Sequence, residues 1–272
     1  MTIIEKQNRI QFLQSLQTGI NSVIAQLTIS GNRVGAKVVE GNYNLKSKSN
    51  VTKLLLDLDK LQDEERLNLY TTFTSGINNM MGLSVSQLQQ RLNSKKAGVN
   101  LINAFAGMED RVDSFLNDEK IGKLLTKIWT DKDKAKVVET VIRSIGKGSS
   151  AFELSEELTK VIGKGSIRSN IDRVANTELV RAYNKASYDV IKESKGILEE
   201  DFDTYINVFL SPYHPEEDIC DDLVGNYDIG DAPIPPHHPN CICGYKEVIL
   251  PKGKGVSVNE INRADVLDIQ FS

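Results

Sequence analysis

The chain has 272 residues, a formal net charge of −4 and a hydrophobic content of 40%. This length allows one large or two modest domains, and the negative charge gives no global reason to expect sequence-independent binding to nucleic acid. No segment approaches the ~20 apolar residues that span a bilayer, and the first residues lack the apolar core of a signal peptide. We therefore expect a protein without membrane contact that is made and folded in a cytosol.

The region before Pro212 contains no proline and consists of successive helical patterns. Apolar residues recur at spacings of three and four from Ile10 to Leu27, which predicts an amphipathic helix. The stretch 31–50 is rich in Gly, Asn, Ser and Lys and predicts a loop. Further expected elements are a helix over 54–70, a break at 76–84, and helices at 85–92, 101–116, 121–128 and 135–145.

One pentapeptide, Ile-Gly-Lys-Gly-Ser, occurs twice, at 145–149 and 162–166. A phosphate-binding loop would need two glycines at a fixed separation after a strand, whereas each copy follows a helical pattern. We therefore expect two helix ends, where glycine adopts the left-handed conformation. The pairs Ser150 with Glu153 and Ser169 with Asp172 predict capping boxes that open the following helices.

The best-defined helical pattern runs from 167 to 194 and has a continuous apolar face. A polar stripe on the same helix comprises Arg173, Thr177, Arg181 and Asn184. One interpretation is a solvated face with side-chain pairs that contribute only a few tenths of a kcal/mol. The other is a surface on which Glu178 and the arginines fix the next module through charge-assisted hydrogen bonds. The spacing alone favours the solvated face.

After Gly196 the pattern changes from helical to β-branched and aromatic. The segment 203–210 predicts a strand, and 226–231 and 244–250 predict two further short strands. The tail 253–272 carries enough apolar residues to pack against another surface. All seven prolines lie between Pro212 and Pro251, so this part of the chain is expected to be rich in turns.

All three histidines and all three cysteines lie between His214 and Cys243. Structural zinc sites take four ligands from thiolates and imidazoles in a tetrahedron. An odd number of cysteines in a reducing cytosol favours a metal over disulfides. The candidate ligands are Cys220, Cys241, Cys243, His238 and His214, four of which would bind one Zn²⁺. His237 is left out because it points away from His238 in an extended backbone.

Other interpretations of the cluster remain open. A catalytic zinc would keep one open coordination position and use a carboxylate from 216–218, as in a metal-dependent hydrolase or nuclease. A zinc deaminase signature is absent, and a Cys-x-Cys pair beside a histidine is weak evidence for a Cys–His nucleophile. Unrelated buried thiols would not explain the clustering. A regulatory protein that binds a partner through the zinc module is a third alternative. We favour a structural site and assign no catalytic residue.

Three segments follow one another along the chain at 211–215, 218–221 and 235–243. Together they resemble the carboxy-terminal signature of the Mu F-like head morphogenesis proteins of tailed bacteriophages, which are also called minor head or minor capsid proteins. The upstream segment 173–184 is similar to the helix that precedes this signature in the family. The resemblance covers about 149–250. The chain departs from the family pattern at Ile242 and at Asn176, where arginine is common.

The helical patterns, the strand patterns and the histidine–cysteine cluster together predict a mainly α-helical protein with a small carboxy-terminal α+β module that zinc stabilises. The expected organisation is a helical region at 1–148, a Mu F-like domain at 149–252 (helices 150–195, zinc-containing β module 200–252) and a tail at 253–272. The zinc is expected to hold together a module too small to bury enough apolar surface alone, so chelation is expected to unfold the chain from about residue 200 onward.

The resemblance also implies a structural, non-enzymatic virion protein. It would be present in several copies at the portal vertex or the head interior after synthesis in the host cytoplasm. Its expected partners are the portal protein, the capsid proteins and the packaged DNA. Its expected roles are head assembly and DNA packaging or ejection.

Overall fold

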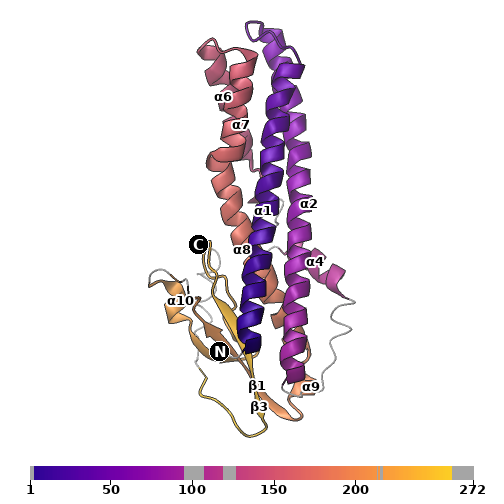
Figure 1. Cartoon of the computed structure of the whole chain (residues 1–272), viewed down its shortest axis with the longest axis vertical. Helices are drawn as coiled ribbons and strands as arrows, with labels where there is room; N and C mark the ends of the chain where they lie inside the picture. Colours follow the sequence, from indigo (N-terminus) through magenta and orange to yellow (C-terminus); the bar gives the residue numbers. More distant parts are fainter. Residues whose placement is uncertain (1–2, 95–106, 119–126, 213, 215–216, 259–272) are drawn as a thin grey trace. The chain divides into compact units, whose positions relative to one another are not determined.

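The structure is a computed structural model that describes residues 3–94, 107–118, 127–212, 214 and 217–258. It is mainly helical, with a small antiparallel sheet near the carboxy-terminal end, which confirms the predicted combination of helices and strands (Figure 1). The chain divides into two compact units. The bundle unit comprises Thr18–Ser75 and Gly122–Ala175, and the cysteine unit comprises Met1–Gln17, Gly76–Ile121 and Asn176–Ser272.

The long helices α1, α2 and α8 each contribute residues to both units. The helices are α1 (Ile3–Glu40), α2 (Lys48–Ser94), α4 (Met108–Leu116), α6 (Asp131–Gly146), α7 (Ala151–Lys164), α8 (Ser166–Glu193), α9 (Lys195–Leu198) and α10 (Ile219–Asp222). The strands are β1 (Phe202–Phe209), β2 (Gly225–Asp228) and β3 (Gly244–Pro251). The three predicted strands and the helices at 135–145 and 167–194 are confirmed. Most of the predicted helix at 121–128 and of the tail lies outside the described residues. Among the described residues, no helix has the length and apolarity needed to cross a membrane.

The loop predicted over 31–50 is confirmed only at 41–47 and is wrong for the rest, because α1 continues to Glu40 and α2 begins at Lys48. A Cβ added at Gly35 would lie 2.5 Å from Thr159 Oγ1 and 2.9 Å from the Ser155 carbonyl oxygen, both on α7. At Gly31 the carbonyl oxygen accepts a hydrogen bond from Thr159 Oγ1 at 3.3 Å. Both glycines lie within α1. Because they carry no side chain, the backbones of α1 and α7 can approach closely.

The break predicted at 76–84 is also wrong, because α2 passes through this stretch without interruption. A Cβ at Gly76 would lie 3.1 Å from Leu179 Cδ2 on α8. Glycine at this position thus makes room for a neighbouring helix. The helix predicted at 85–92 is the last part of α2.

The two pentapeptides lie at helix ends, as predicted, but only the first uses a left-handed glycine. Gly148 follows α6 with a φ of 75°, and the next helix opens with the predicted capping box between Ser150 and Glu153. After α7, Gly165 is extended, with φ −95° and ψ −154°. The helix start predicted at Ser169 is wrong, because α8 begins at Ser166 and the Ser169 amide donates to the Gly165 carbonyl within its first turn.

The bundle unit has an apolar core with a few buried polar side chains. Trp129 is fully buried, and its Nε1 donates to Oε1 of the buried Gln62 at 3.2 Å. Glu65, also fully buried, accepts a hydrogen bond from Ser30 Oγ at 2.6 Å and pairs with Arg33 at 2.6 Å. Each of these polar groups has a partner within the unit, which offsets the free energy of burying it.

The sheet of the cysteine unit has the strand order β2-β1-β3, and both pairings are antiparallel. Alternate residues of β1, including Ile206 and Val208, are buried. On β3, Glu247 forms two hydrogen bonds with Arg91 of α2, at 2.7 and 2.9 Å, and its side chain is only 1% exposed. This bidentate ion pair ties β3 to a helix of the same unit.

Candidate metal centre

The residues of the candidate centre come from two segments that flank β2. The first segment follows β1 and contains His214 and the short helix α10, on which Cys220 lies. The second joins β2 to β3 and contains His238, Cys241 and Cys243. Asp218 caps α10, and its Oδ1 accepts a hydrogen bond from the Cys220 amide at 2.7 Å. All three cysteines are buried and in contact with one another, and Leu210 packs against them.

The structure brings all five predicted ligands together. One group is His214, Cys220 and Cys243, and another is Cys220, His238 and Cys241; within each group the ligand atoms lie within 4.8 Å of one another. The Sγ atoms of Cys220 and Cys241 are 3.5 Å apart, and Cys243 Sγ lies 3.9 Å from His214 Nδ1. Ligand atoms on one tetrahedral zinc ion would be separated by roughly 3.5–3.8 Å, given the usual bond lengths. The separation of 3.5 Å lies at one end of this range and that of 3.9 Å just beyond the other, so both are close to those of a metal site.

The arrangement of the thiols lowers the pKa of the Cys241 thiol, so that this thiol ionises readily. The hydrogen bond from Cys220 lowers the pKa of Cys241, and hydrogen bonds from Cys243 and from backbone amides of His237 and Cys243 act in the same direction. The pKa of Cys220 is raised, first because its thiol donates to Cys241. A bound cation would replace the shared proton and allow the neighbouring thiols to ionise.

The three histidines have different surroundings. His214 Nε2 lies 2.9 Å from Asp221 Oδ2, and this hydrogen bond is the main reason why the pKa of His214 is raised. His238 Nε2 lies 3.1 Å from Asp218 Oδ2. His237 is only 7% exposed and belongs to neither of the groups described above. Burial lowers the pKa of His237 to about 4, so it is neutral at physiological pH.

The segment 235–243 is held on the surface of α8. Asn184 Nδ2 donates to the carbonyl oxygens of Pro235, at 3.0 Å, and Cys243, at 3.4 Å. Thr177 Oγ1 accepts from the Asn240 amide at 3.0 Å. The solvated-face interpretation of this helix is therefore wrong for Thr177 and Asn184, both of which are buried.

The contacts of Arg9 with the ligand segments were not predicted from the sequence, whereas Glu178 was one of the residues expected to form charge-assisted hydrogen bonds. Arg9, on α1, donates from Nη2 to Ser211 Oγ at 3.0 Å and to the Ile242 carbonyl oxygen at 3.3 Å. Glu178 is buried and pairs with Arg181 at 2.6 Å on α8 itself. Arg9 is more than 200 positions from both of its partners, and no local pattern distinguishes it from other arginines in a helix.

Comparison with protein-family models, with curated proteins and with solved structures gives no match to this chain. The chemistry of the site must therefore be inferred from its own residues. Those residues include three buried thiols, which are ligands that zinc and other soft cations prefer.

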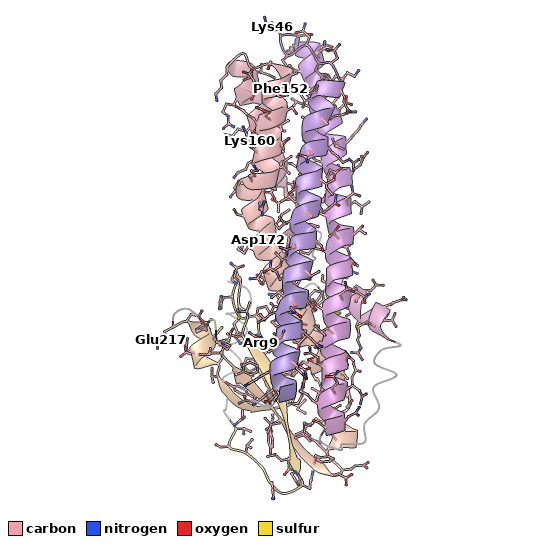
Figure 2. All side chains as sticks on the ribbon, in the orientation of Figure 1. Arg9, Lys46, Phe152, Lys160, Asp172 and Glu217 are labelled. Carbon is pink, nitrogen blue, oxygen red and sulfur yellow. The ribbon has the colours of Figure 1, made fainter. Side chains whose placement is uncertain are left out.

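The carboxylates near the thiols serve local structure. Asp218, in the run where the catalytic alternative places its carboxylate, caps α10 and faces His238. Asp221 accepts a hydrogen bond from the Asp218 amide as well as from His214. Glu217 is exposed and lies at the edge of the unit beside α10 (Figure 2). Glu216 lies outside the described residues.

Proposed function

We propose that this chain is a structural minor head protein of a tailed bacteriophage in which one zinc ion is held by the cysteines and one histidine. It contacts the portal protein and the inner capsid, and it assists head assembly and DNA packaging or ejection. Its zinc is structural, and the protein has no catalytic activity.

The observation that carries this proposal is the contact between two segments that resemble the Mu F-like family. The helix segment 173–184 and the carboxy-terminal signature 235–243 are separate in sequence. They are joined beside the cysteines by hydrogen bonds that Asn184 donates and by one that Thr177 accepts. A chance resemblance would not require the two segments to meet, so their contact supports a shared domain.

The metal would act on the ligand segments more than on the sheet. The strand β3 is tied to the helices by Glu247 with Arg91 and by Tyr245, whose hydroxyl donates to the Asn184 carbonyl at 3.0 Å. These contacts need no metal. We therefore expect chelation to unfold the segments within 211–243, where the thiols and histidines lie. The sheet strands outside these segments, which the sequence-based expectation of unfolding from about residue 200 onward included, are expected to stay folded.

Metal content tests the zinc part of the proposal. The full chain, purified without chelators, is expected to contain one zinc per chain by elemental analysis, and Cys241→Ser is expected to lose it. Ile242→Ala is the matched control, since it alters the neighbouring residue without removing a ligand atom. Equal zinc content in wild type and Cys241→Ser would exclude the site.

Particle composition tests the virion part. In a lysate containing the phage particles, the chain is expected to sediment with procapsids and heads at a copy number below that of the capsid protein. Cys241→Ser is expected to be incorporated less than Ile242→Ala. A chain that stays entirely in the soluble fraction would contradict the proposal.

The alternative is a metal-dependent hydrolase or nuclease. His214, Asp218 and Asp221 form a further group of side chains that could hold an ion, which is the observation in its favour. This alternative requires hydrolytic turnover that is lost in Glu217→Gln while the fold and the zinc content are retained. We expect no zinc-dependent turnover of nucleic acid or ester substrates in the wild type or in Glu217→Gln.

A further inference from the structure

The helix α6 has two apolar stripes, and only one of them belongs to the core of the bundle unit. The core stripe includes Val137 and Val141, both of which are buried. The second stripe consists of four apolar residues on another side of the helix, namely Ala135, Val138, Ile142 and Ile145. Val138 is 36% exposed and Ile142 is 60% exposed. The outward face of a helix is normally polar, so a continuous apolar stripe on it indicates a contact surface.

The second stripe is complementary to a copy of itself. Its residues are three, four and three positions apart, which is the heptad spacing with which two helices pack along a seam. In an antiparallel pair of α6 helices related by a two-fold axis, Ala135 lies opposite the partner's Ile145. Val138 then lies opposite the partner's Ile142. Each layer combines a smaller with a larger side chain, as an isologous contact requires.

The charged residues beside the stripe favour the same antiparallel pairing. Glu139 and Arg143 are exposed on one flank, four positions apart. Antiparallel pairing brings Glu139 close to the partner's Arg143 on both sides of the two-fold axis, whereas parallel pairing would bring each residue close to its own copy. Among the residues that the structure describes, Glu139 has no ion-pair partner. Arg143 comes only within 3.9 Å of Glu157, and its side chain is 49% exposed. Both charges are therefore available to a second chain.

The other flank of the stripe is occupied within the chain. Lys134 Nζ lies 2.6 Å from Asp63 Oδ1 and 3.4 Å from Asp59 Oδ1, and both carboxylates belong to α2. These ion pairs direct the Lys134 flank toward α2. The flank that carries Glu139 and Arg143 is thus the one that a second helix can approach.

We propose that this face of α6 is an interface between two copies of this chain, with the two α6 helices packed antiparallel about a two-fold axis. The proposal depends neither on the metal site nor on the proposed function. The interface consists of one helix of 16 residues from each copy. Because such a contact is smaller than that of a stable dimer, we expect a weak dimer whose population rises with concentration.

Sedimentation of the full chain over a range of concentrations tests the interface. Wild type is expected to pass from monomer to dimer as the concentration rises. Ile142→Ser is expected to weaken association at least about tenfold, since the buried isoleucine is lost from both copies. Ile29→Ser is the matched control, because Ile29 is 51% exposed but lies on α1. A wild type that stays monomeric at every concentration would overturn the proposal, as would equal weakening by Ile29→Ser.

Exchange of the two charges tests the antiparallel orientation. Glu139→Arg and Arg143→Glu, each made alone, are expected to weaken association several-fold, because each places like charges opposite one another. The double variant with both substitutions is expected to recover the association of wild type. A double variant that stays as weak as the single ones would overturn the antiparallel pairing, and so would a dimer that neither single substitution affects. All these residues are exposed, so the variants are expected to fold, and circular dichroism checks that they do.

Discussion

The bundle unit and the cysteine unit are stabilised in different ways. The bundle unit depends on apolar residues repeated along helices, and its buried polar side chains, such as Gln62 and Glu65, pair within the unit. In the cysteine unit, Arg9, Arg91 and Asn184 converge from three helices on a small sheet and a ligand segment. The comparison shows that periodic burial can build the first kind of unit, whereas the second needs individual residues far apart in the sequence.

The largest expected effect in the cysteine unit comes from breaking its buried ion pair. Glu247→Gln leaves the Arg91 guanidinium without its charged partner, and we expect the free energy of unfolding to fall by about 3–5 kcal/mol. Denaturant unfolding, followed by a probe within the cysteine unit, measures the change. The control is Glu199→Gln, which breaks the exposed pair with Lys195. It is expected to change the free energy of unfolding by less than about 1 kcal/mol. Similar losses in both variants would show that the buried pair stabilises the unit no more than the exposed pair does.

In the bundle unit the corresponding test is a core truncation. Leu58→Ala removes a side chain that is 1% exposed, and we expect a loss of about 2–5 kcal/mol. Leu56, on the same helix, is 60% exposed, so Leu56→Ala is expected to stay within about 0.5 kcal/mol of wild type. Thermal and denaturant unfolding measure both. We expect neither substitution to change the zinc content of the folded protein, and a loss of zinc in Leu58→Ala would erase the distinction between the units.

A smaller effect is expected where α8 holds the ligand segment. Asn184→Ala leaves the buried carbonyl oxygens of Pro235 and Cys243 without their donor, which is expected to cost about 1–3 kcal/mol. Zinc affinity, measured by competition with a chelator, is expected to fall as well. Asn176→Ala, which removes only an exposed contact with Asn240, serves as the control. Unchanged affinity in Asn184→Ala would mean that α8 does not organise the site.

The smallest expected effect is a pH dependence in the bundle unit. Burial and the hydrogen bond to Asp57 raise the pKa of Tyr43 from 10.0 to about 12. Because the folded state holds this proton more tightly, the contribution is fully present below pH 10 and is lost as the pH rises to about 12. The stability difference between wild type and Tyr43→Phe should therefore shrink over this range. A difference that stays constant from pH 9 to 12 would contradict the assignment.

Local patterns predicted much of the structure. The spacing of apolar residues gave the helix at 167–194, and β-branched residues gave the three strands. The clustering of histidines and cysteines selected five residues that do lie together. Glycine content misled the prediction at Gly35 and Gly76, because composition does not distinguish a glycine in a loop from one beneath a neighbouring helix.

The long-range contacts could not be predicted in the same way. The partners of Arg9 and Arg91 lie more than 150 positions away. The solvated and buried interpretations of the α8 polar stripe differ only in what covers the helix. Periodicity locates a face of a helix, and tertiary packing decides whether that face meets water.

Hydrogen exchange before and after chelation tests the proposed role of the metal most directly. On removal of zinc from the full chain, amide protection is expected to fall in the segments within 211–243. It is expected to persist in β1, in β3 and in the helices of the bundle unit. Unchanged protection within 211–243 would contradict a structural metal there, and a loss that includes the bundle unit would contradict the separate stabilisation of the two units.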